Sequence, residues 1–457
     1  MQRFALLSLI ALLSGCTPQR AAGPKLLGIA TLTGATDQSG LKGKLENQVD
    51  AGNMLGGTGS SLTYAGHDRF LALPDRGPNA RVWSEALDQT TSFVSRFHEI
   101  TLIAEPSKTG APWPMAIKAS LKDTRLLYSD TPLNYGAVTP EINETGKNGS
   151  GGRYYFTGRS DNFGTGGSLN FANGRLDPEG LCLSRDKKSV FISDEYGPSV
   201  SQFNRKTGQR ERSFSLPKAF EASFLSPTGD REIKGNLTGR VANKGLEGLT
   251  CTPDGQSLVG FEQSALLQDG GESGRANRIV RIDLATGRVE QFVYDNQIPN
   301  PTNPSAKKTY NSSEILAINN HEFLILERDG KGQGDGSPAL IKQLLKVDLS
   351  GATDIGPLNL SGEAKLLPYA VPKSLFLDLR QLFSDHGFKD TEIPAKLEGA
   401  AFGDDVTVAG TRYHSLWISN DNDFLPATAG ENRFFLIGFT DQDLGVDNTG
   451  RPTLLER

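Results

Sequence analysis

Two stretches of the sequence repeat one pattern and decide the fold. The first is Glu179-Gly-Leu-Cys-Leu-Ser-Arg-Asp186, followed after a polar turn by Val190-Phe-Ile-Ser-Asp194. The second is Glu247-Gly-Leu-Thr-Cys-Thr-Pro-Asp254, followed by Leu258-Val-Gly-Phe-Glu262. In both, an acidic residue opens one apolar run and another acidic residue closes the next. Each unit therefore predicts two antiparallel strands joined by a turn, with both acidic residues at the same edge of the sheet.

The same pattern recurs along the chain. Weaker copies begin at Ser60, Glu314 and Glu398, and their second runs end at Asp75, Glu327 and Asn420. Further strand-like pairs follow, such as 277–284 with 288–293, so each unit has four strands. This is the plan of an all-β, single β-propeller. The long gap between Ser60 and Glu179 leaves room for one extra blade, with strands near 113–119, 124–129 and 153–157, which gives about six blades.

The predicted propeller occupies residues 25–457 as one domain with long rim insertions. We expect 25–33 to supply the outer strand of the last blade and so close the ring. The insertions are 130–176, 218–245, 295–310 and 362–396, and loops of this length usually form rims or lids. Within the last insertion, the spacing of apolar residues over 373–383 predicts one short amphipathic helix.

Composition excludes several classes of protein. The 457 residues include 48 basic and 53 acidic side chains, with a net charge of −5 and no basic block. We therefore expect no nucleic-acid partner. Apolar runs along the whole chain exclude disorder. We expect a monomer that acts on a small molecule.

The N-terminus indicates where the protein is located in the cell. Residues 1–15 contain one Arg and a short apolar run, which is typical of a signal peptide. Leu13-Ser-Gly-Cys16 matches a bacterial lipobox, so we expect Cys16 to be lipidated and 16–24 to form a tether; an ordinary secretory signal is the alternative. Thr17 favours outer-membrane sorting, so we expect an envelope lipoprotein facing the periplasm and held at the membrane only by lipid.

Two further cysteines remain after the lipobox. Cys182 and Cys251 follow Glu-Gly-Leu at positions that differ by one, so alternating strands would point them to opposite faces. We therefore expect two buried free thiols, with a disulfide in the oxidising compartment as the alternative.

The repeat predicts that polar residues gather at one mouth of the axial channel. Carboxylates so placed repel one another unless a cation compensates them. Oxygen ligands favour Ca²⁺, or alternatively Mg²⁺, over zinc. We expect the metal ligands among Asp75, Glu179, Asp194, Glu195, Glu262, Glu398, Asn420, Asp421 and Asp423. For catalysis we expect Glu247 or Glu327 as general base and Arg76 with Arg328 as a phosphoryl clamp.

A structural interpretation of the same residues stays open. A Glu at the start of a blade can hydrogen-bond backbone N–H groups of the next blade, and an Asp in a turn can cap that turn. Nucleophile-elbow and P-loop motifs are absent from the sequence, and the five His residues form no recognisable relay.

Five motifs in order resemble the family called "esterase-like activity of phytase". They are Leu73-Pro-Asp-Arg-Gly-Pro-Asn79, Ile192-Ser-Asp-Glu-Tyr-Gly-Pro198 with the preceding Glu179-Gly-Leu, Asn243-Lys-Gly-Leu-Glu-Gly-Leu249, Leu326-Glu-Arg-Asp329 and Asn420-Asp-Asn-Asp-Phe424. The resemblance covers roughly residues 45–440. It implies a propeller and hydrolysis of a phosphoester or ester. The Glu-Gly blade starts are also similar to gluconolactonase and paraoxonase propellers, which implies an axial Ca²⁺.

Three functions follow from these observations. The first is a Ca²⁺-dependent, phytase-like hydrolase of phosphomonoesters, in which Glu179, Glu195, Glu247 and Asp421 hold metal or activate water. The second is a carboxylic ester or lactone hydrolase that uses the same metal. The third is a non-catalytic cell-surface propeller with structural Ca²⁺.

Overall fold

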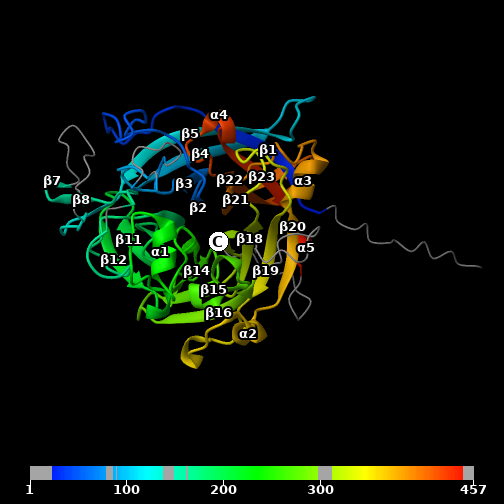
Figure 1. Ribbon diagram of the computed structural model, residues 1–457. Helices are drawn as coiled ribbons and strands as arrows, with labels where there is room; N and C mark the ends of the chain where they lie inside the picture. The colour runs from blue at the N-terminus through cyan, green and yellow to red at the C-terminus, as the bar shows by residue number, and fades with distance from the viewer. Residues whose placement is uncertain are drawn as a thin grey trace, which may run out of the picture.

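The structure is a five-bladed β-propeller (Figure 1). The computed structural model describes residues 23–78, 86–88, 90–136, 149–160, 163–296 and 311–445. The predicted signal peptide, Cys16 and most of the predicted tether lie outside these residues. Five four-stranded antiparallel sheets surround one axis, which confirms the all-β prediction and the four-strand repeat.

Four blades are continuous in sequence, and the strands of each run from the axis outward. Blade 1 contains β2 (Ser61–Gly66), β3 (Arg69–Leu73), β4 (Arg96–Pro106) and β5 (Met115–Leu126). Blade 2 contains β9 (Pro178–Leu183), β10 (Ser189–Asp194), β11 (Ser199–Asn204) and β12 (Arg210–Ser215). Blade 3 contains β13 (Leu246–Cys251), β14 (Ser257–Glu262), β15 (Ala276–Asp283) and β16 (Val289–Asp295). Blade 4 contains β17 (Asn311–Ala317), β18 (Glu322–Arg328), β19 (Lys342–Asp348) and β20 (Lys373–Asp378).

Blade 5 closes the ring with both ends of the chain. It contains β21 (Leu397–Val408), β22 (Thr411–Asn420), β23 (Asn432–Phe439) and, outermost, β1 (Lys25–Leu32). The N-terminal strand pairs antiparallel with β23, from Lys25 opposite Gly438 to Leu32 opposite Asn432. The predicted closing strand is therefore confirmed. The inner strands β2, β9, β13, β17 and β21 contact one another in turn around the axis.

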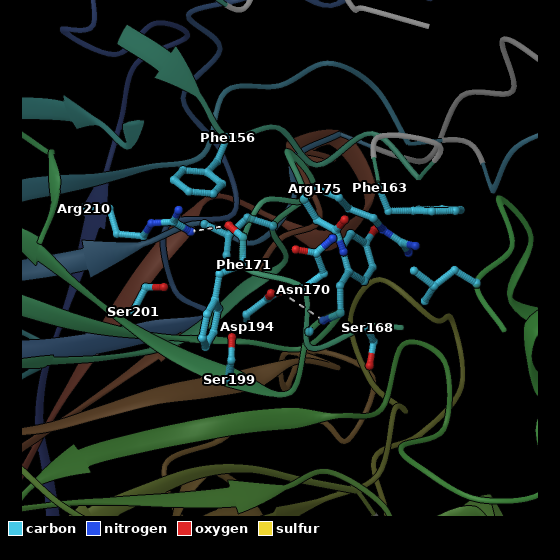
Figure 2. A pocket seen from close by; sticks show the side chains of 15 residues that line it. Phe156, Phe163, Ser168, Asn170, Phe171, Arg175, Asp194, Ser199, Ser201 and Arg210 are labelled. Carbon is cyan, nitrogen blue, oxygen red and sulfur yellow. Dashed lines mark hydrogen bonds between the residues drawn. The ribbon is translucent and has the colours of Figure 1, made fainter. Parts of the chain in front are cut away.

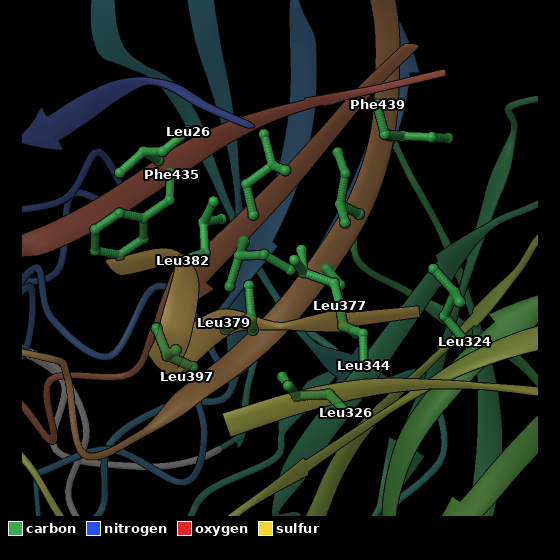
Figure 3. Close-up of a cluster of buried hydrophobic side chains, with 14 of the residues drawn as sticks. Leu26, Leu324, Leu326, Leu344, Leu377, Leu379, Leu382, Leu397, Phe435 and Phe439 are labelled. Atoms are coloured by element: carbon green, nitrogen blue, oxygen red, sulfur yellow. The ribbon is translucent and has the colours of Figure 1, made fainter. Parts of the chain in front are cut away.

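The hydrophobic core lies between the blades. Figure 3 shows the cluster between blades 4 and 5, which includes Leu324 and Leu344 of blade 4 and Leu397 and Phe435 of blade 5. All four side chains are buried. Burying a side chain of this size stabilises the fold by roughly 1.5–3 kcal/mol relative to leaving it in water.

The prediction of an extra blade within 113–157 was wrong. Residues 115–126 form β5, the outer strand of blade 1, because β4 and β5 make one long hairpin. Beyond it, β6 (Tyr128–Ser129), β7 (Gly149–Ser150) and β8 (Arg153–Tyr155) form only a small three-stranded sheet on the rim. The weak periodicity of this region reflects a rim insertion.

The helix predicted over 373–383 was only half right. Residues Lys373–Asp378 form β20, and helix α3 (Leu379–Asp385) begins where Asp378 accepts a hydrogen bond from Gln381 N–H. The first half of the apolar pattern, residues 373–378, therefore belongs to the edge strand of blade 4 and not to a helix. The other α-helices among the described residues are one to two turns long: α1 (Gly229–Gly235), α2 (Glu363–Leu366), α4 (Pro426–Ala429) and α5 (Asp441–Leu444). Among the described residues, no helix is long and apolar enough to cross a membrane.

Crowding of the inner strands explains the Gly of each Glu-Gly pair. A Cβ on Gly180 would lie 2.5 Å from Leu249 N, and one on Gly248 would lie 2.6 Å from Ile315 N. A Cβ on Gly399 would lie 2.9 Å from Leu62 N. Each Gly therefore allows one inner strand to approach the backbone of the next.

The expectation of two free thiols was also wrong. Cys182 of β9 and Cys251 of β13 form a disulfide, with their Cα atoms 5.7 Å apart. The one-position offset does direct the two side chains to opposite faces of their sheets. Neighbouring blades pack face to face, however, so opposite faces of blades 2 and 3 meet.

Candidate functional site

One polar pocket of about 390 Å³ lies at the end of the axis where the acidic ends of the repeat meet. All five blades and their connecting loops contribute to it. Its charged lining residues are Arg76, Glu179, Glu195, Lys244, Glu247, Arg328, Asp335, Lys396, Glu398, Asp421 and Asp423. We call this the axial pocket. The predicted gathering of blade-start and strand-end residues at one mouth is therefore observed for part of the predicted set.

The blade-start Glu residues enter the axial pocket from β-bulges. Glu179, Glu247 and Glu398 each lie where the register of the first two strands of a blade shifts. All three are buried and line the pocket. A bulge re-aims the side chain at a strand end, which is why the same position in three blades points to the axis.

A two-residue alternation decides which strand-end residues reach the pocket. The second strand of each blade leads into a pair of polar residues. The second member of every pair lines the axial pocket: Arg76, Glu195, Gln263, Arg328 and Asp421. The first members do not line it: Asp75, Asp194, Glu262, Glu327 and Asn420. Successive side chains of an extended segment point to opposite sides.

Asp194 and Asn420 accept hydrogen bonds from backbone N–H groups outside the axial pocket. Asp194 accepts hydrogen bonds from Asp177 N–H and Tyr196 N–H, both at 3.1 Å, and burial raises its pKa to about 7. Its side chain lies in a separate small pocket with Ser199 and Asn170 (Figure 2). Asn420 accepts a hydrogen bond from Arg433 N–H at 2.7 Å. The structural interpretation therefore describes both residues.

Glu327 faces the neighbouring blade. It accepts a hydrogen bond from Tyr294 Oη at 2.6 Å and pairs with Lys373 Nζ at 2.5 Å. The prediction that it gathers at the shared mouth is therefore not met.

Glu262 is buried near two arginines. Among the described residues neither of its carboxylate oxygens has a hydrogen-bond partner, and burial raises its pKa to about 8 although Arg240 and Arg278 oppose the shift. A neutral Glu262 fits this environment.

Glu314 does not line the axial pocket. It accepts hydrogen bonds from Ser61 Oγ at 2.8 Å and from Leu249 N–H at 3.2 Å, which ties together three blades. Burial raises its pKa well above the usual range. This blade-start Glu acts as a structural link.

Three carboxylates form a cluster on the blade 2 side of the axial pocket. Asp177, Glu179 and Glu195 offer oxygens that all lie within 4.8 Å of one another, and all three residues are buried. We call them the Asp177 cluster. Burial first, and then the carboxylates of Glu247 and Asp177, raise the pKa of Glu179 well above its usual range. Glu195 behaves in the same way, and its Oε2 has no hydrogen-bond partner among the described residues.

A second cluster lies on the blade 5 side. Asp75, Asp421 and Asp423 also offer oxygens within 4.8 Å of one another, and we call them the Asp75 cluster. Lys396 Nζ lies 2.6 Å from Asp421 and 2.7 Å from Asp423. Burial lowers the pKa of Lys396, but the carboxylates of Asp421 and Glu398 outweigh this and hold it well above its usual range. The second cluster thus contains its own cation.

The two arginines of the pocket pair with carboxylates. Arg76 Nη1 lies 2.8 Å from Asp177, and Arg328 pairs with Glu398. Glu247 Oε1 accepts a hydrogen bond from Gln263 Nε2 at 2.6 Å, while its Oε2 has no partner among the described residues. Burial, followed by the charge of Glu398, raises the pKa of Glu247 to about 8. This carboxyl group can therefore carry a proton near neutral pH.

The donors of the Asp177 cluster fit a hard divalent cation. They are carboxylate oxygens without His or Cys, which suits Ca²⁺ or Mg²⁺. The partnerless Oε2 of Glu195 is buried at a polar pocket, where an ion would satisfy it. Asp177, Glu179 and Glu195 are the residues that could hold the ion.

Sequence reasoning missed Asp177, Lys396, Gln263 and Lys244. A signal for three of them existed. Asp177 and Lys396 each lie two residues before a blade-start Glu, and Gln263 follows Glu262 as Glu195 follows Asp194. Extending the repeat by two residues before its first strand and one after its second would have found them.

The fold and the site define an all-β propeller whose axis ends in a carboxylate-rich pocket suited to a cation. The family model described as "Phytase-like: Esterase-like activity of phytase" matches residues 54–424. The chain belongs to this family.

Individual relatives are more distant. An "Uncharacterized secreted protein" of Arthroderma benhamiae is 30% identical over 329 residues, which make up 62% of this chain and 61% of that protein. The chain thus spans 61% of the length of the curated relative that it matches.

Two solved structures are similar at low identity. A structural genomics protein of unknown function from Bacteroides thetaiotaomicron is 11% identical, with a TM-score of 0.34 over 91% of this chain and 76% of that one. A putative 6-phosphogluconolactonase from Bacteroides uniformis is 12% identical, with a TM-score of 0.28 over 82% of each chain. At these scores neither likeness bears on function.

Proposed function

We propose that the protein is a divalent-cation-dependent hydrolase of phosphomonoesters that acts in the axial pocket. One observation carries the proposal. The buried Asp177 cluster, in which Glu195 Oε2 has no hydrogen-bond partner among the described residues, contributes Glu179 and Glu195 to the same 390 Å³ pocket as Arg76, Arg328 and Lys396. Membership of a phytase-like family supports the reaction class. The ion would be Ca²⁺, with Mg²⁺ as the alternative, held by the Asp177 cluster.

A bound divalent cation would neutralise charge on the phosphoryl oxygens and make a water molecule more acidic. Glu179 and Glu195 would give up their protons when it binds, because the ion replaces the repulsion that raises their pKa. Asp177 keeps its contact with Arg76 and so fixes the guanidinium at the pocket wall.

Arg76 and Arg328 would bind the phosphoryl oxygens. Both line the pocket and both already pair with a carboxylate, Asp177 and Glu398 respectively. A guanidinium has five N–H groups, so each can keep its carboxylate and still donate to a phosphoryl oxygen. Lys396 would add a third positive charge from the blade 5 side.

Glu247 would carry the proton of the reaction. Its raised pKa of about 8 keeps it protonated at neutral pH, so it can donate to the leaving oxygen. Gln263 positions it by holding Oε1 at 2.6 Å, which leaves Oε2 for the substrate.

A second candidate is the hydrolysis of a carboxylic ester or lactone. Seven carboxylates but only four cationic side chains are among the described residues that line the pocket. This excess of negative charge favours a neutral substrate over a phosphoester unless at least one cation is bound.

We also propose an envelope location, reached by export and a lipid at Cys16. The Cys182–Cys251 disulfide supports an oxidising compartment. The predicted orientation towards the periplasm from the outer membrane rests on the lipobox and Thr17. Replacing Cys16 by Ser should abolish labelling with a radioactive fatty acid and release the protein from the membrane fraction.

One assay tests the proposed reaction. The chain from residue 17 onward is stripped with a chelator and incubated with p-nitrophenyl phosphate, phytate and p-nitrophenyl acetate, with and without Ca²⁺ or Mg²⁺. We expect cation-dependent release of phosphate, which Arg328→Gln and Glu195→Gln abolish and Glu392→Gln, on the exposed surface, leaves intact. Turnover of the acetate alone supports the second candidate. No turnover, with Ca²⁺ still raising the melting temperature, leaves a binding propeller with structural Ca²⁺.

A further inference from the structure

A groove of about 460 Å³ lies between blades 1 and 2, away from the axial pocket. Its charged lining residues are Glu99, Asp123, Arg125, Lys187, Lys188, Arg205 and Lys206. We call this the basic groove. Five cationic side chains face two carboxylates here, whereas the described lining of the axial pocket has four against seven. The whole chain has a net charge of −5, so the positive groove stands against the overall charge.

Arginines neutralise both carboxylates of the basic groove. Arg125 pairs with Asp123. Glu99 lies 3.0 Å from Arg205 Nη2 and 3.1 Å from Arg69 Nη1. The carboxylates are therefore not available to compensate the three lysines.

The lysines of the basic groove keep their positive charge almost uncompensated. Lys187 Nζ donates to the backbone oxygen of Ala65 at 3.3 Å, and Lys206 has no ion pair among the described residues. Lys188 Nζ lies 3.7 Å from Asp186, but the two side chains are 81% and 59% exposed. An exposed pair of this kind contributes little. Three ammonium groups thus face solvent from one groove.

Two turns place the basic groove towards the end of the propeller opposite the axial pocket. Residues 184–188 join β9 to β10, residues 205–209 join β11 to β12, and both turns contribute cations to the groove. From the first turn β10 runs to Asp194, and the next residue, Glu195, lines the axial pocket. A strand of six residues covers roughly 20 Å. The molecule is therefore basic at one end of blade 2 and acidic at the other.

The N-terminal strand begins at the same end as the basic groove. β23 starts at the axial-pocket end, where Arg433 N–H donates to Asn420, and runs away from it. Lys25, the first residue of β1, pairs with Gly438 near the far end of β23. The predicted tether of residues 16–24 therefore joins the fold at the groove end. Fully extended, a segment of this length reaches at most about 30 Å, so a lipid on it would hold this end towards the bilayer.

We propose that the basic groove binds the headgroups of anionic phospholipids and holds the propeller on the membrane with its axial pocket facing away from the bilayer. This contact would add to the lipid anchor, which the sequence alone predicts as the only attachment. An anionic surface attracts each lysine or arginine close to it and repels the acidic end of the molecule. Both effects favour the same orientation, which leaves the pocket accessible to dissolved molecules.

Vesicle binding by the chain from residue 17 onward tests the groove without the lipid. Sedimentation with phosphatidylcholine vesicles is compared with sedimentation with vesicles that also contain phosphatidylglycerol. Chelator is present throughout, so that no Ca²⁺ can bridge the acidic pocket to the lipid. We expect binding to the anionic vesicles alone and its loss in high salt, because the lysines are exposed and their charges are screened.

Charge reversal at two exposed lysines tests the surface itself. Lys188→Glu combined with Lys206→Glu should lower the partition coefficient on anionic vesicles at least about tenfold. The matched control is Lys331→Glu combined with Lys389→Glu, which changes the net charge equally at exposed positions in loops that lead to the axial pocket. The control should stay within about twofold of the parent, since those lysines face away from the bilayer. Melting curves establish that each variant is folded.

Acetylation of the lipidated full-length protein measures its orientation. On anionic vesicles Lys188 and Lys206 should lose reactivity relative to phosphatidylcholine vesicles, whereas Lys331 and Lys389 should react equally on both. Mass spectrometry reads each site separately in the unsubstituted protein.

Three results would overturn the inference. They are equal binding to both kinds of vesicle, an equal loss in the two double variants, and protection of Lys331 and Lys389 in place of Lys188 and Lys206. None of these measurements involves turnover, so a protein without hydrolase activity would refute the proposed function and leave this inference standing. The position of the tether rests on the proposed lipid at Cys16, and vesicle binding by the chain from residue 17 onward is independent of it.

Discussion

The two carboxylate clusters at the axial pocket differ in how the repulsion among their carboxylates is compensated. At the same repeat position, two residues before the blade-start Glu, blade 2 has Asp177 and blade 5 has Lys396. The backbone is alike in both, since the carbonyl of this residue accepts a hydrogen bond from Glu195 N–H in blade 2 and from Asp421 N–H in blade 5. One cluster therefore gains an ammonium group and the other gains a third carboxylate. The comparison teaches that the repeat sets the geometry, while a single side chain decides whether a cluster needs an external cation.

Removing the internal cation should make the two clusters alike. Lys396→Met leaves Asp421 and Asp423 without their partner, so we expect a loss of about 3 kcal/mol in the free energy of unfolding, measured with urea in the presence of chelator. The value is at the lower end for a broken buried pair because Lys396 is 31% exposed. Millimolar Ca²⁺ should restore part of the loss. A Lys396→Met protein as stable as the parent in chelator would contradict the role given to Lys396.

Supplying the missing cation should stabilise the Asp177 cluster. At a Ca²⁺ concentration of about 100 times Kd, we expect the parent protein to gain about 2.7 kcal/mol in unfolding free energy. Glu195→Gln should remove this gain, since it replaces an acidic ligand by a neutral one. Glu392→Gln, at an exposed site, is the control. An unchanged Ca²⁺ response in Glu195→Gln would place the ion elsewhere.

The pH dependence of stability should report the buried carboxyl groups of the axial pocket, and the response of that dependence to Ca²⁺ should report the Asp177 cluster. Glu179, Glu195 and Glu247 have raised pKa values in the folded state, so the folded protein binds more protons than the unfolded chain. In chelator, stability should therefore fall as pH rises from about 4, where unfolded Glu ionises, through about 8, the pKa of Glu247. The slope is about 1.4 kcal/mol per pH unit for each proton lost.

Saturating Ca²⁺ should flatten this slope, because the ion removes the cost of ionising the cluster. Unfolding curves measured across this pH range with and without Ca²⁺ test the point. A stability that rises with pH in chelator would show that these carboxyl groups are not protonated in the fold.

The smallest effect is expected at a strand-end residue that turns away from both clusters. Asp194→Asn keeps the oxygen that accepts from Asp177 N–H and Tyr196 N–H, so we expect a change below about 1 kcal/mol in unfolding free energy. The Ca²⁺-induced shift in melting temperature should match that of the parent protein. A reduced shift would mean that Asp194 takes part in cation binding.

Local sequence patterns predict much of this molecule. The Glu-Gly starts and the alternation of apolar runs predict the propeller, the position of β1 and the entry of Glu179, Glu247 and Glu398 into the pocket. These features depend only on strand periodicity and on crowding near the axis. The apolar alternation and the Glu-Gly pairs of the repeats indicate both.

The features that sequence missed depend on contacts between blades. The Cys182–Cys251 disulfide forms because opposite faces of two sheets meet, which no single strand reveals. Asp194 and Glu262 fall one residue short of the position that faces the axis, which Glu195 and Gln263 occupy. The blade count was wrong because the β4–β5 hairpin extends into a rim insertion with similar periodicity.

The pairing of β1 with β23 also sets the order of events during synthesis. Residues 25–32 are synthesised long before their partners at 432–438. Until β23 has been made, β1 has no strand with which to form hydrogen bonds, and blade 5 lacks its outer strand. Closure of this long loop is slow compared with local hairpin formation. The ring of blades therefore stays open until β23 has been made.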